Sequence, residues 1–342
     1  MFPKFALSVI ALAACSATWA QNTVTISGTA DMYVGSIQYA GTERQNKLGS
    51  GGMTTSWIGF SGTEDLGGGL KAGFALGSFM RLDSGALGRF NGDTSYARDA
   101  NVSLSGSFGS LKLGRSSSPN FVPSLLVNPF GASFAFSPLI QHMDMTNVPG
   151  YTKTAQADTG WSNQVVYSTP KIFGGLTVNL HYQFSNQPSP NDDKNNAAIS
   201  ATYASGPLLL SGFYEQAELN NPTVTMRALK AKDWMLGGAY DLKFLKAFAS
   251  YGAAEDMAQQ DDEAATVQAG VSIPLGSGKV LASYAQTKYE VSSASDLTRK
   301  TLSLGYDYAL SKRTDVYSIV MHDRFTGTNS GTSYAIGIRH HF

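Results

Sequence analysis

The 342-residue chain contains a single cysteine, Cys15, and only 15% of its residues are charged. One cysteine cannot form an internal disulfide. Outside the extreme N-terminus, no run of 18 residues is apolar enough to form a transmembrane helix. The 25 basic and 25 acidic residues balance, which argues against a nucleic-acid partner, because such proteins normally present a basic surface.

Residues 1–20 have the parts of a secretory signal peptide. Lys4 supplies the positive charge, residues 5–14 form the apolar core, and residues 18–20 end in a small-x-small site before Gln21. Residues 12–15 also resemble a bacterial lipobox, which would place a lipid on Cys15. Cleavage after Ala20 is favoured because strand-like sequence begins at Thr23, and it would leave a mature chain without cysteine.

Much of the remaining chain alternates between apolar and polar residues, which is typical of strands with two different faces. The alternation is clearest in residues 175–184, 301–308 and 333–342. Alternation alone fits either a soluble sandwich or an outer-membrane barrel. The aromatic residues near the strand ends, and polar faces that run the full length of strands of about 8–11 residues, favour the barrel.

Short and long connections alternate along the chain. Seven short and eight long connections predict sixteen strands, with both chain ends on the short-turn side. We therefore predict an all-β fold: a 16-stranded antiparallel transmembrane β-barrel over residues 21–342, with short periplasmic turns and long outer loops. The longest connection, residues 116–162, contains five prolines and no sustained strand or helix period. A connection of that length is uncommon in a compact domain, and a wide barrel offers a lumen for it to fill.

Several stretches resemble the trimeric general porins of Gram-negative β-proteobacteria. They span the mature chain and comprise residues 56–74 with the SGTEDLG turn, 96–115, 163–170, 308–314 and 337–342. The resemblance implies a homotrimer in the outer membrane, in contact with outer-membrane lipid and lipopolysaccharide, that passes ions and small hydrophilic solutes by passive diffusion. It also implies that loop 116–162 folds inward as a constriction, and that Phe342 is the signal read by the barrel-insertion machinery. We predict no cofactor and no metal site.

Charges are costly on a lipid-facing surface, so charged residues within strands should point into the lumen. Alternation places Trp57, Lys71, Arg81 and Asp99 inward. The same alternation turns Arg98 outward, whereas the family resemblance implies an inward arginine there; a β-bulge would reconcile the two.

The long loop supplies further candidate constriction residues. Arg115 lies at its start, with the trimer interface as an alternative position, and residues 128–131 form a candidate turn at the loop tip. The ionisable candidates within the loop are His142, Asp144, Lys153 and Asp158. Family members commonly carry an arginine at the position of Trp57, so this chain should have a less basic, partly aromatic pore wall. We predict weak ion selectivity.

Enzyme function finds little support in the sequence. The five histidines lack metal-ligand spacing, and the adjacent His340 and His341 point to opposite faces of a strand. An outer-membrane lipid hydrolase would need a serine–histidine pair on the lipid-facing surface, and His340 is the only outward histidine near the chain end. A structural or adhesive barrel is the other alternative.

Overall fold

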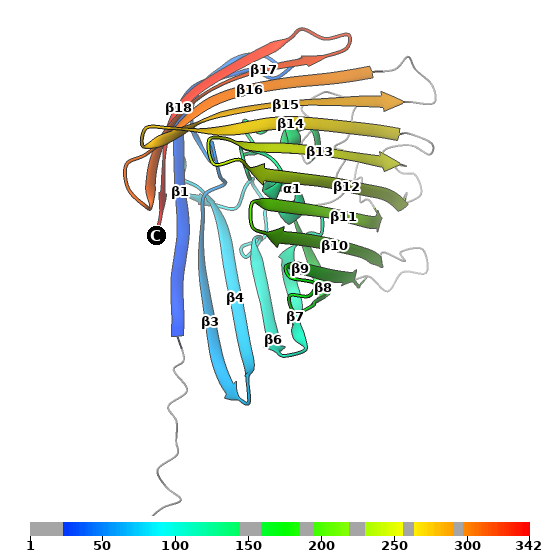
Figure 1. Ribbon diagram of the computed structural model, residues 1–342. Coiled ribbons are helices and arrows are strands. Elements are labelled where there is room, and N and C mark those ends of the chain that lie inside the picture. Colours follow the sequence, from blue (N-terminus) through cyan, green and yellow to red (C-terminus); the bar gives the residue numbers. More distant parts are fainter. Residues whose placement is uncertain (1–22, 144–158, 185–194, 219–229, 256–262, 291–296) are drawn as a thin grey trace, which may run out of the picture.

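The computed structural model describes residues 23–143, 159–184, 195–218, 230–255, 263–290 and 297–342. Its strands form one antiparallel sheet that closes on itself where β1 pairs with β18 (Figure 1). No helix in these residues is long and apolar enough to cross a membrane.

All strands pair with antiparallel neighbours. Their bounds are β1 (Thr23–Ile37), β2 (Gln45–Ser50), β3 (Trp57–Gly67), β4 (Leu70–Arg81), β5 (Ala86–Leu87), β6 (Asp99–Gly106), β7 (Gly109–Ser117), β8 (Gly160–Ser168), β9 (Leu176–Gln183), β10 (Asn196–Ser205), β11 (Leu208–Glu218), β12 (Lys230–Asp241), β13 (Lys246–Glu255), β14 (Glu263–Leu275), β15 (Gly278–Glu290), β16 (Leu297–Ala309), β17 (Thr314–Phe325) and β18 (Gly331–His341).

The 16-stranded barrel predicted from the sequence is confirmed, and the sheet carries two additional strands. β2 and β3 both pair with β1, so they act as one wall strand interrupted at residues 51–56. β5 has two residues and pairs only with the end of β4. Both additions lie inside stretches predicted as long outer loops, and their pairings are too short to leave a clear alternation in the sequence.

The interruption between β2 and β3 is held by one buried carboxylate. Asp31 accepts hydrogen bonds from the backbone nitrogens of Gly52, Met53 and Thr54 at 3.1, 2.8 and 2.8 Å, and from the Tyr317 hydroxyl at 2.5 Å. An ionised carboxylate satisfies several orphan N–H groups at once. Asp31 therefore fixes this segment against the interior of the barrel.

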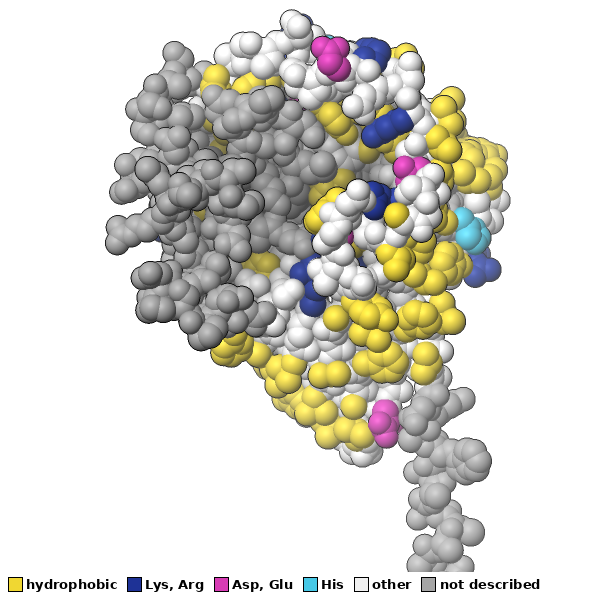
Figure 2. Space-filling view, turned by 180° about the vertical axis from the view of Figure 1, so that it is seen from behind, with side chains coloured by type: hydrophobic (Ala, Val, Ile, Leu, Met, Phe, Trp, Pro, Cys, Tyr) yellow, Lys and Arg dark blue, Asp and Glu magenta, His cyan; other side chains and the backbone are white. Residues whose placement is uncertain are grey.

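The alternation of side chains has the direction expected in a membrane. On β18, Tyr334, Ile336 and Ile338 are exposed, whereas Ser333 and Ala335 are buried on the interior side. A soluble sandwich would show the reverse, with its apolar residues in the core. Hydrophobic side chains accordingly cover much of the outer surface in Figure 2. This face suits lipid contact.

The barrel is sealed by its last residue. Gly28 and Phe342 exchange two backbone hydrogen bonds of 3.0 and 3.1 Å. The Phe342 ring lies over Gly28 so closely that a Cβ there would be 2.4 Å from the ring. Only glycine permits this approach.

The long loop is shorter than predicted, because β7 continues to Ser117 and β8 already begins at Gly160. Its described part contains two helices, α1 (Phe121–Leu126) and α2 (Pro138–Met143). Each has six residues, too few to produce a visible period in the sequence. Figure 1 shows α1 within the curve of the sheet, behind β11 and β12.

The loop packs against interior side chains of strands from several sides of the barrel. Phe130 and Phe136 join a buried cluster with Tyr33 of β1, Leu281 of β15 and Tyr317 of β17. A second buried cluster joins residues of the loop to β11 and β12; its members are Val127, Leu139, Met143, Phe213 and Met235.

Three interior glycines leave room for the loop. A Cβ on Gly237 would lie 2.8 Å from Val127, and one on Gly270 would lie 2.8 Å from Pro129. A Cβ on Gly305 would lie 3.2 Å from Phe130. The wall from β12 to β16 is therefore shaped to receive residues 127–130 of the loop.

Candidate functional site

Two arginine–aromatic stacks lie side by side on the wall formed by β3 and β4. Trp57 lies opposite both Thr29, which is buried on the interior face, and Phe79. The Arg98 guanidinium lies over the Trp57 ring at 3.7 Å, and that of Arg89 lies over Phe79 at 5.0 Å. Cation–π contact of this kind holds a guanidinium flat against a ring.

Each of these two arginines is also paired with a carboxylate. Arg98 donates a hydrogen bond from Nη1 to Oδ2 of its neighbour Asp99. Arg89 makes a bidentate pair with Asp93, from Nε to Oδ2 and from Nη2 to Oδ1, both at 2.8 Å. Bidentate pairs fix geometry as well as charge. We call these four residues with Trp57 and Phe79 the paired wall.

The position of the Arg98–Asp99 pair explains why strand alternation and the family resemblance gave opposite directions for Arg98. Asp99 begins β6 opposite the interior residue Gly77, and the chain bends at Arg98 immediately before it. This bend, rather than a β-bulge, lets both side chains lie near Trp57. Both remain accessible, because the side chain of Arg98 is 38% exposed and that of Asp99 is 17% exposed.

The second pair was not predicted, because residues 82–95 read only as a polar outer loop. Burial by itself would raise the pKa of Asp93, but hydrogen bonds from Arg89 and the charge of Arg89 hold it below its usual value. Asp93 is therefore ionised at neutral pH and compensates Arg89. In the sequence, only the spacing of four residues between Arg89 and Asp93 could have indicated this ion pair.

Three other predicted residues are not members of the paired wall, although Arg81 lies two residues beyond Phe79 on β4. Lys71 lies directly opposite Asp65 in the strand register, beside a short turn at the far end of β4. Arg81 lies at the long-loop end of β4, where its Nη2 donates to Asn91 Oδ1 at 2.8 Å. The third is Arg115 of β7.

Arg115 occupies a bulge of β7, where the register with β8 shifts. It lies opposite Ala100, on the face shared with the exposed Val102. Its Nε donates to Ala97 O at 2.5 Å and its Nη1 to Ser162 Oγ at 2.9 Å. Arg115 therefore lies on the outward-facing side of β7 and not on the side that faces the lumen.

His142 also differs from its predicted role, because it is fully buried. Its Nδ1 lies 2.7 Å from Thr287 Oγ1 and its Nε2 lies 2.7 Å from Thr301 Oγ1. Burial, followed by the charge of Arg299, lowers the pKa of His142 well below its usual value. A neutral imidazole bonded on both sides attaches α2 to the wall and does not line the pore. The other loop candidates, Asp144, Lys153 and Asp158, lie outside the described residues.

A buried ion pair completes this attachment. Asp323 accepts hydrogen bonds from Arg299 Nε and Nη2 at 3.1 and 3.0 Å, and from the Ala40 backbone nitrogen at 3.0 Å. Arg299 Nη1 donates to the backbone oxygen of Gln141 at 2.9 Å. Both charged side chains are 0% exposed. We call Arg299, Asp323, Gln141 and His142 the loop anchor.

A third group of charges lies near the short-turn end of the interior. Arg339 pairs with Asp315 at 3.2 Å and with Asp307 at 3.5 Å, and Lys279 pairs with Asp307 at 3.4 Å. Again both signs are present. Strand alternation in β16 to β18 turns these charged residues toward the interior, and this pattern could have identified the group from the sequence.

No metal site emerges from the described segments. No group of three or more histidine, cysteine or carboxylate side chains there could hold a metal ion. Outward-facing His340 contacts Thr314, with Nδ1 2.9 Å from Oγ1. A threonine hydroxyl in that contact gives no support to the lipid-hydrolase alternative.

Comparison with known families gives a match to the Gram-negative porin model over residues 6–328. The chain belongs to this porin family. It is 32% identical to outer membrane porin protein 32 of Delftia acidovorans, over 92% of this chain and 87% of the relative. It is 26% identical to an outer membrane porin protein of Bordetella pertussis, over 83% of this chain and 81% of the relative.

The structure agrees with these relatives. It superimposes on the anion-selective porin from Comamonas acidovorans with a TM-score of 0.78 and 27% identity, covering 94% of this porin and all of the other chain. The predicted β-proteobacterial porin type, outer-membrane location and passive channel function are therefore confirmed.

Proposed function

We propose that the constriction of this porin lies between loop residues 118–143 and the paired wall, and that it is weakly ion-selective. The observation that carries the proposal is the pairing of each wall arginine with a carboxylate, Arg98 with Asp99 and Arg89 with Asp93. Paired charges nearly cancel at the distance of a passing ion, so neither cations nor anions are strongly favoured.

The loop adds no charge on its side in this region. Residues 116–143 contain no Asp, Glu, Lys or Arg, and their one ionisable side chain, His142, is buried. The loop instead presents apolar groups, including Val122, which is exposed, and the stacked rings of Phe121 and Phe134 at 6.2 Å. In the proposed arrangement this apolar loop faces Trp57 across the channel, and we expect the channel to pass amphipathic and aromatic solutes alongside small ions.

The relative from Comamonas acidovorans is named as anion-selective, so selectivity is the property to measure. The zero-current potential of the purified porin in a planar bilayer under a KCl gradient should be close to zero. A strongly anion-selective potential would refute the proposed charge cancellation. The variant Trp57→Arg should move the potential toward anion selectivity, because it adds an uncompensated cation to the wall.

We also propose three further features that the sequence predicts. The porin forms a homotrimer, residues 1–20 are removed as a signal peptide, and Phe342 is the signal recognised by the barrel-insertion machinery. Conductance that appears in triplet steps would support the trimer, and single independent steps would contradict it. N-terminal sequencing of protein purified from outer membranes should begin at Gln21.

A further inference from the structure

One short segment of the barrel wall is bonded both to the paired wall and to the loop. It comprises residues 51–56, where the strand formed by β2 and β3 is interrupted, and we call it the inward turn. Its last residue, Ser56, directly precedes Trp57. Ser56 O also accepts a hydrogen bond of 2.9 Å from the backbone nitrogen of Met80, the neighbour of Phe79. The inward turn is therefore joined to both aromatic residues of the paired wall.

The other end of the inward turn holds the tip of the loop. Ser133 Oγ donates a hydrogen bond to Gly52 O at 2.6 Å. The same hydroxyl accepts from the backbone nitrogen of Phe136 at 2.9 Å, and the Ser133 nitrogen donates to Phe130 O at 3.2 Å. Ser133 thus connects Gly52 to the two phenylalanines that pack against the barrel wall.

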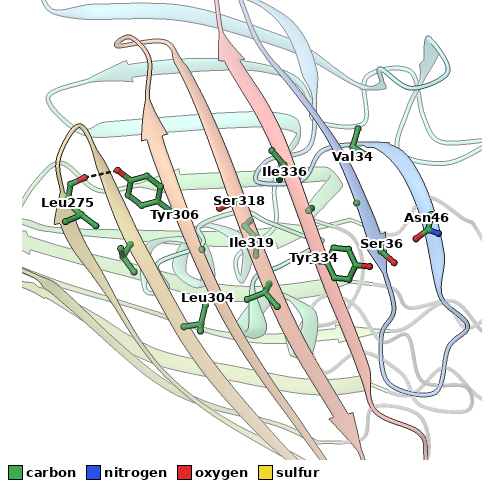
Figure 3. Close-up of a pocket in the computed structure, with 15 residues that line it drawn as sticks. Val34, Ser36, Asn46, Leu275, Leu304, Tyr306, Ser318, Ile319, Tyr334 and Ile336 are labelled. Carbon is green, nitrogen blue, oxygen red and sulfur yellow. Dashed lines mark hydrogen bonds between the residues drawn. The ribbon is translucent and has the colours of Figure 1, made fainter.

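A single carboxylate fixes the shape of the inward turn. Figure 3 shows Val34 and Ile336 on the neighbouring strands β1 and β18, where both are exposed on the outer face. Asp31, three residues before Val34, points to the interior, and its two oxygens accept the backbone N–H groups of residues 52–54. Its own nitrogen donates to Ser56 Oγ at 3.0 Å. Since Asp31 is 0% exposed, it holds the turn without touching solutes.

Two further contacts hold the inward turn from the side of the short turns. The Tyr317 hydroxyl donates to Asp31 and leaves no room for a Cβ on Gly52, so only glycine fits there. Arg339 Nη1 donates to Thr54 Oγ1 at 3.2 Å. The group of interior charges around Arg339 therefore supports the turn as well.

We propose that Asp31 is a positioning residue for the constriction, which sets the spacing between the loop tip and the paired wall by holding the inward turn between them. The inference rests on the proposed function, because it takes the gap between loop and paired wall as the narrowest part of the channel. A carboxylate suits this role, since its two oxygens accept several hydrogen bonds at once. An amide has one acceptor oxygen and would leave at least one of the three N–H groups without a partner.

Two measurements on the intact, folded porin test the proposal. Hydrogen exchange of residues 127–137 in detergent, followed by mass spectrometry, reports how often the loop tip detaches. Asp31→Asn should raise that exchange roughly fivefold, because a buried hydrogen bond is lost. In a planar bilayer, the same variant should have a higher mean single-channel conductance that varies more between openings.

A double-variant experiment separates positioning from a general loss of stability. Ser133→Ala removes the hydroxyl bond to Gly52 and leaves Asp31 bonded to the turn. If Asp31 acts through this bond, the double variant should exchange only as fast as the faster single variant. Ser303→Ala removes a different bond to the loop, from Ser303 Oγ to Phe136 O at 2.7 Å. Its effect should add to that of Asp31→Asn.

Matched controls keep the result specific. Glu64→Gln neutralises an exposed carboxylate on β3 and should change neither exchange nor conductance. Heat-modifiable gel migration checks that each variant is folded. If Asp31→Asn does not fold, Tyr317→Phe removes only the hydroxyl that donates to Asp31, and Ser133→Ala tests the contact with the loop independently.

Three results would overturn the proposal. Unchanged exchange of residues 127–137 in folded Asp31→Asn would exclude the positioning role and leave the proposed function intact. Additive effects of Asp31→Asn and Ser133→Ala would show that the two residues act separately. Faster exchange with unchanged conductance would place the narrowest part of the channel elsewhere, and would overturn the proposed function together with this inference.

Discussion

The two sides of the barrel interior use the same kinds of residue for different purposes. On the side that receives the loop, Arg299 and Asp323 are wholly buried and bond to Gln141 and Ala40. On the paired wall, Arg98 and Asp99 are partly exposed and bond to each other. Since a passing ion meets only accessible charge, we expect the first pair to stabilise the structure and propose that the second acts on permeation. Burial, more than residue type, separates the two roles.

Of the variants considered, Asp323→Ala should lower the free energy of unfolding the most. A small effect would contradict the structural role given to the buried pair. The substitution leaves Arg299 buried without its partner, which costs about 3–5 kcal/mol. Guanidinium-induced unfolding in detergent, followed by tryptophan fluorescence, would show the loss of stability. The control Glu64→Ala removes an exposed carboxylate and should change stability by no more than about 0.5 kcal/mol. Equal stabilities for the two variants would mean that the loop anchor does not stabilise the barrel.

Phe130→Ala tests the apolar part of the same attachment. Phe130 is buried and fills the space beside Gly305, so truncation leaves a cavity and costs about 3 kcal/mol. The same unfolding measurement applies, with exposed Phe90→Ala as the matched control. A loss no greater than that of the control would indicate that the loop does not pack against the wall at this point.

The pH dependence of stability should report on His142. Its pKa is lowered in the folded protein, mainly by burial, so its contribution to stability is present above pH 6.5 and is lost as the pH falls. One pH unit below that value, the loss is about 1.4 kcal/mol. Because other groups also titrate, the quantity to measure is the difference between wild type and His142→Gln across pH 7.5 to 5.5. A constant difference would contradict a neutral, buried imidazole.

Asp99→Asn should have the smallest energetic effect, and this effect should be on ion selectivity. The variant tests whether the paired wall acts on permeating ions. Removing the carboxylate leaves Arg98 uncompensated, which should favour anions by about 1 kcal/mol, or roughly fivefold in permeability ratio. Arg98→Gln should shift the zero-current potential in the opposite direction. Asp65→Asn, beside a short turn, is the control. Unchanged selectivity in both wall variants would place the narrowest part of the channel elsewhere.

The sequence predicted most of the barrel because strand alternation and connection length are local properties. The strand count and the direction of the apolar face both followed from them. β2 and β5 were missed because short pairings within a loop leave no period. The helices α1 and α2 were missed for the same reason.

The site was less predictable, because it depends on contacts between residues far apart in the chain. Trp57 and Asp99 were identified from parity, but the stacking of Arg98 on Trp57 needed a bend that alternation does not encode. The role of His142 depended on threonines 145 and 159 residues away. Arg89 lies in a loop, where the alternation of a strand gives no information on the direction of a side chain.

The path of the loop also constrains the order in which the barrel can form. Residues 118–143 contact β15, β17 and β18, all of which follow them in the chain, while the last seam joins Gly28 to Phe342. Two of its four phenylalanines, Phe130 and Phe136, are buried against the wall, which makes late insertion of the loop sterically costly. We therefore expect the loop to be enclosed while the sheet is still open, so that pairing of the first and last strands retains it inside. Closure of the barrel and placement of the loop would then be one event.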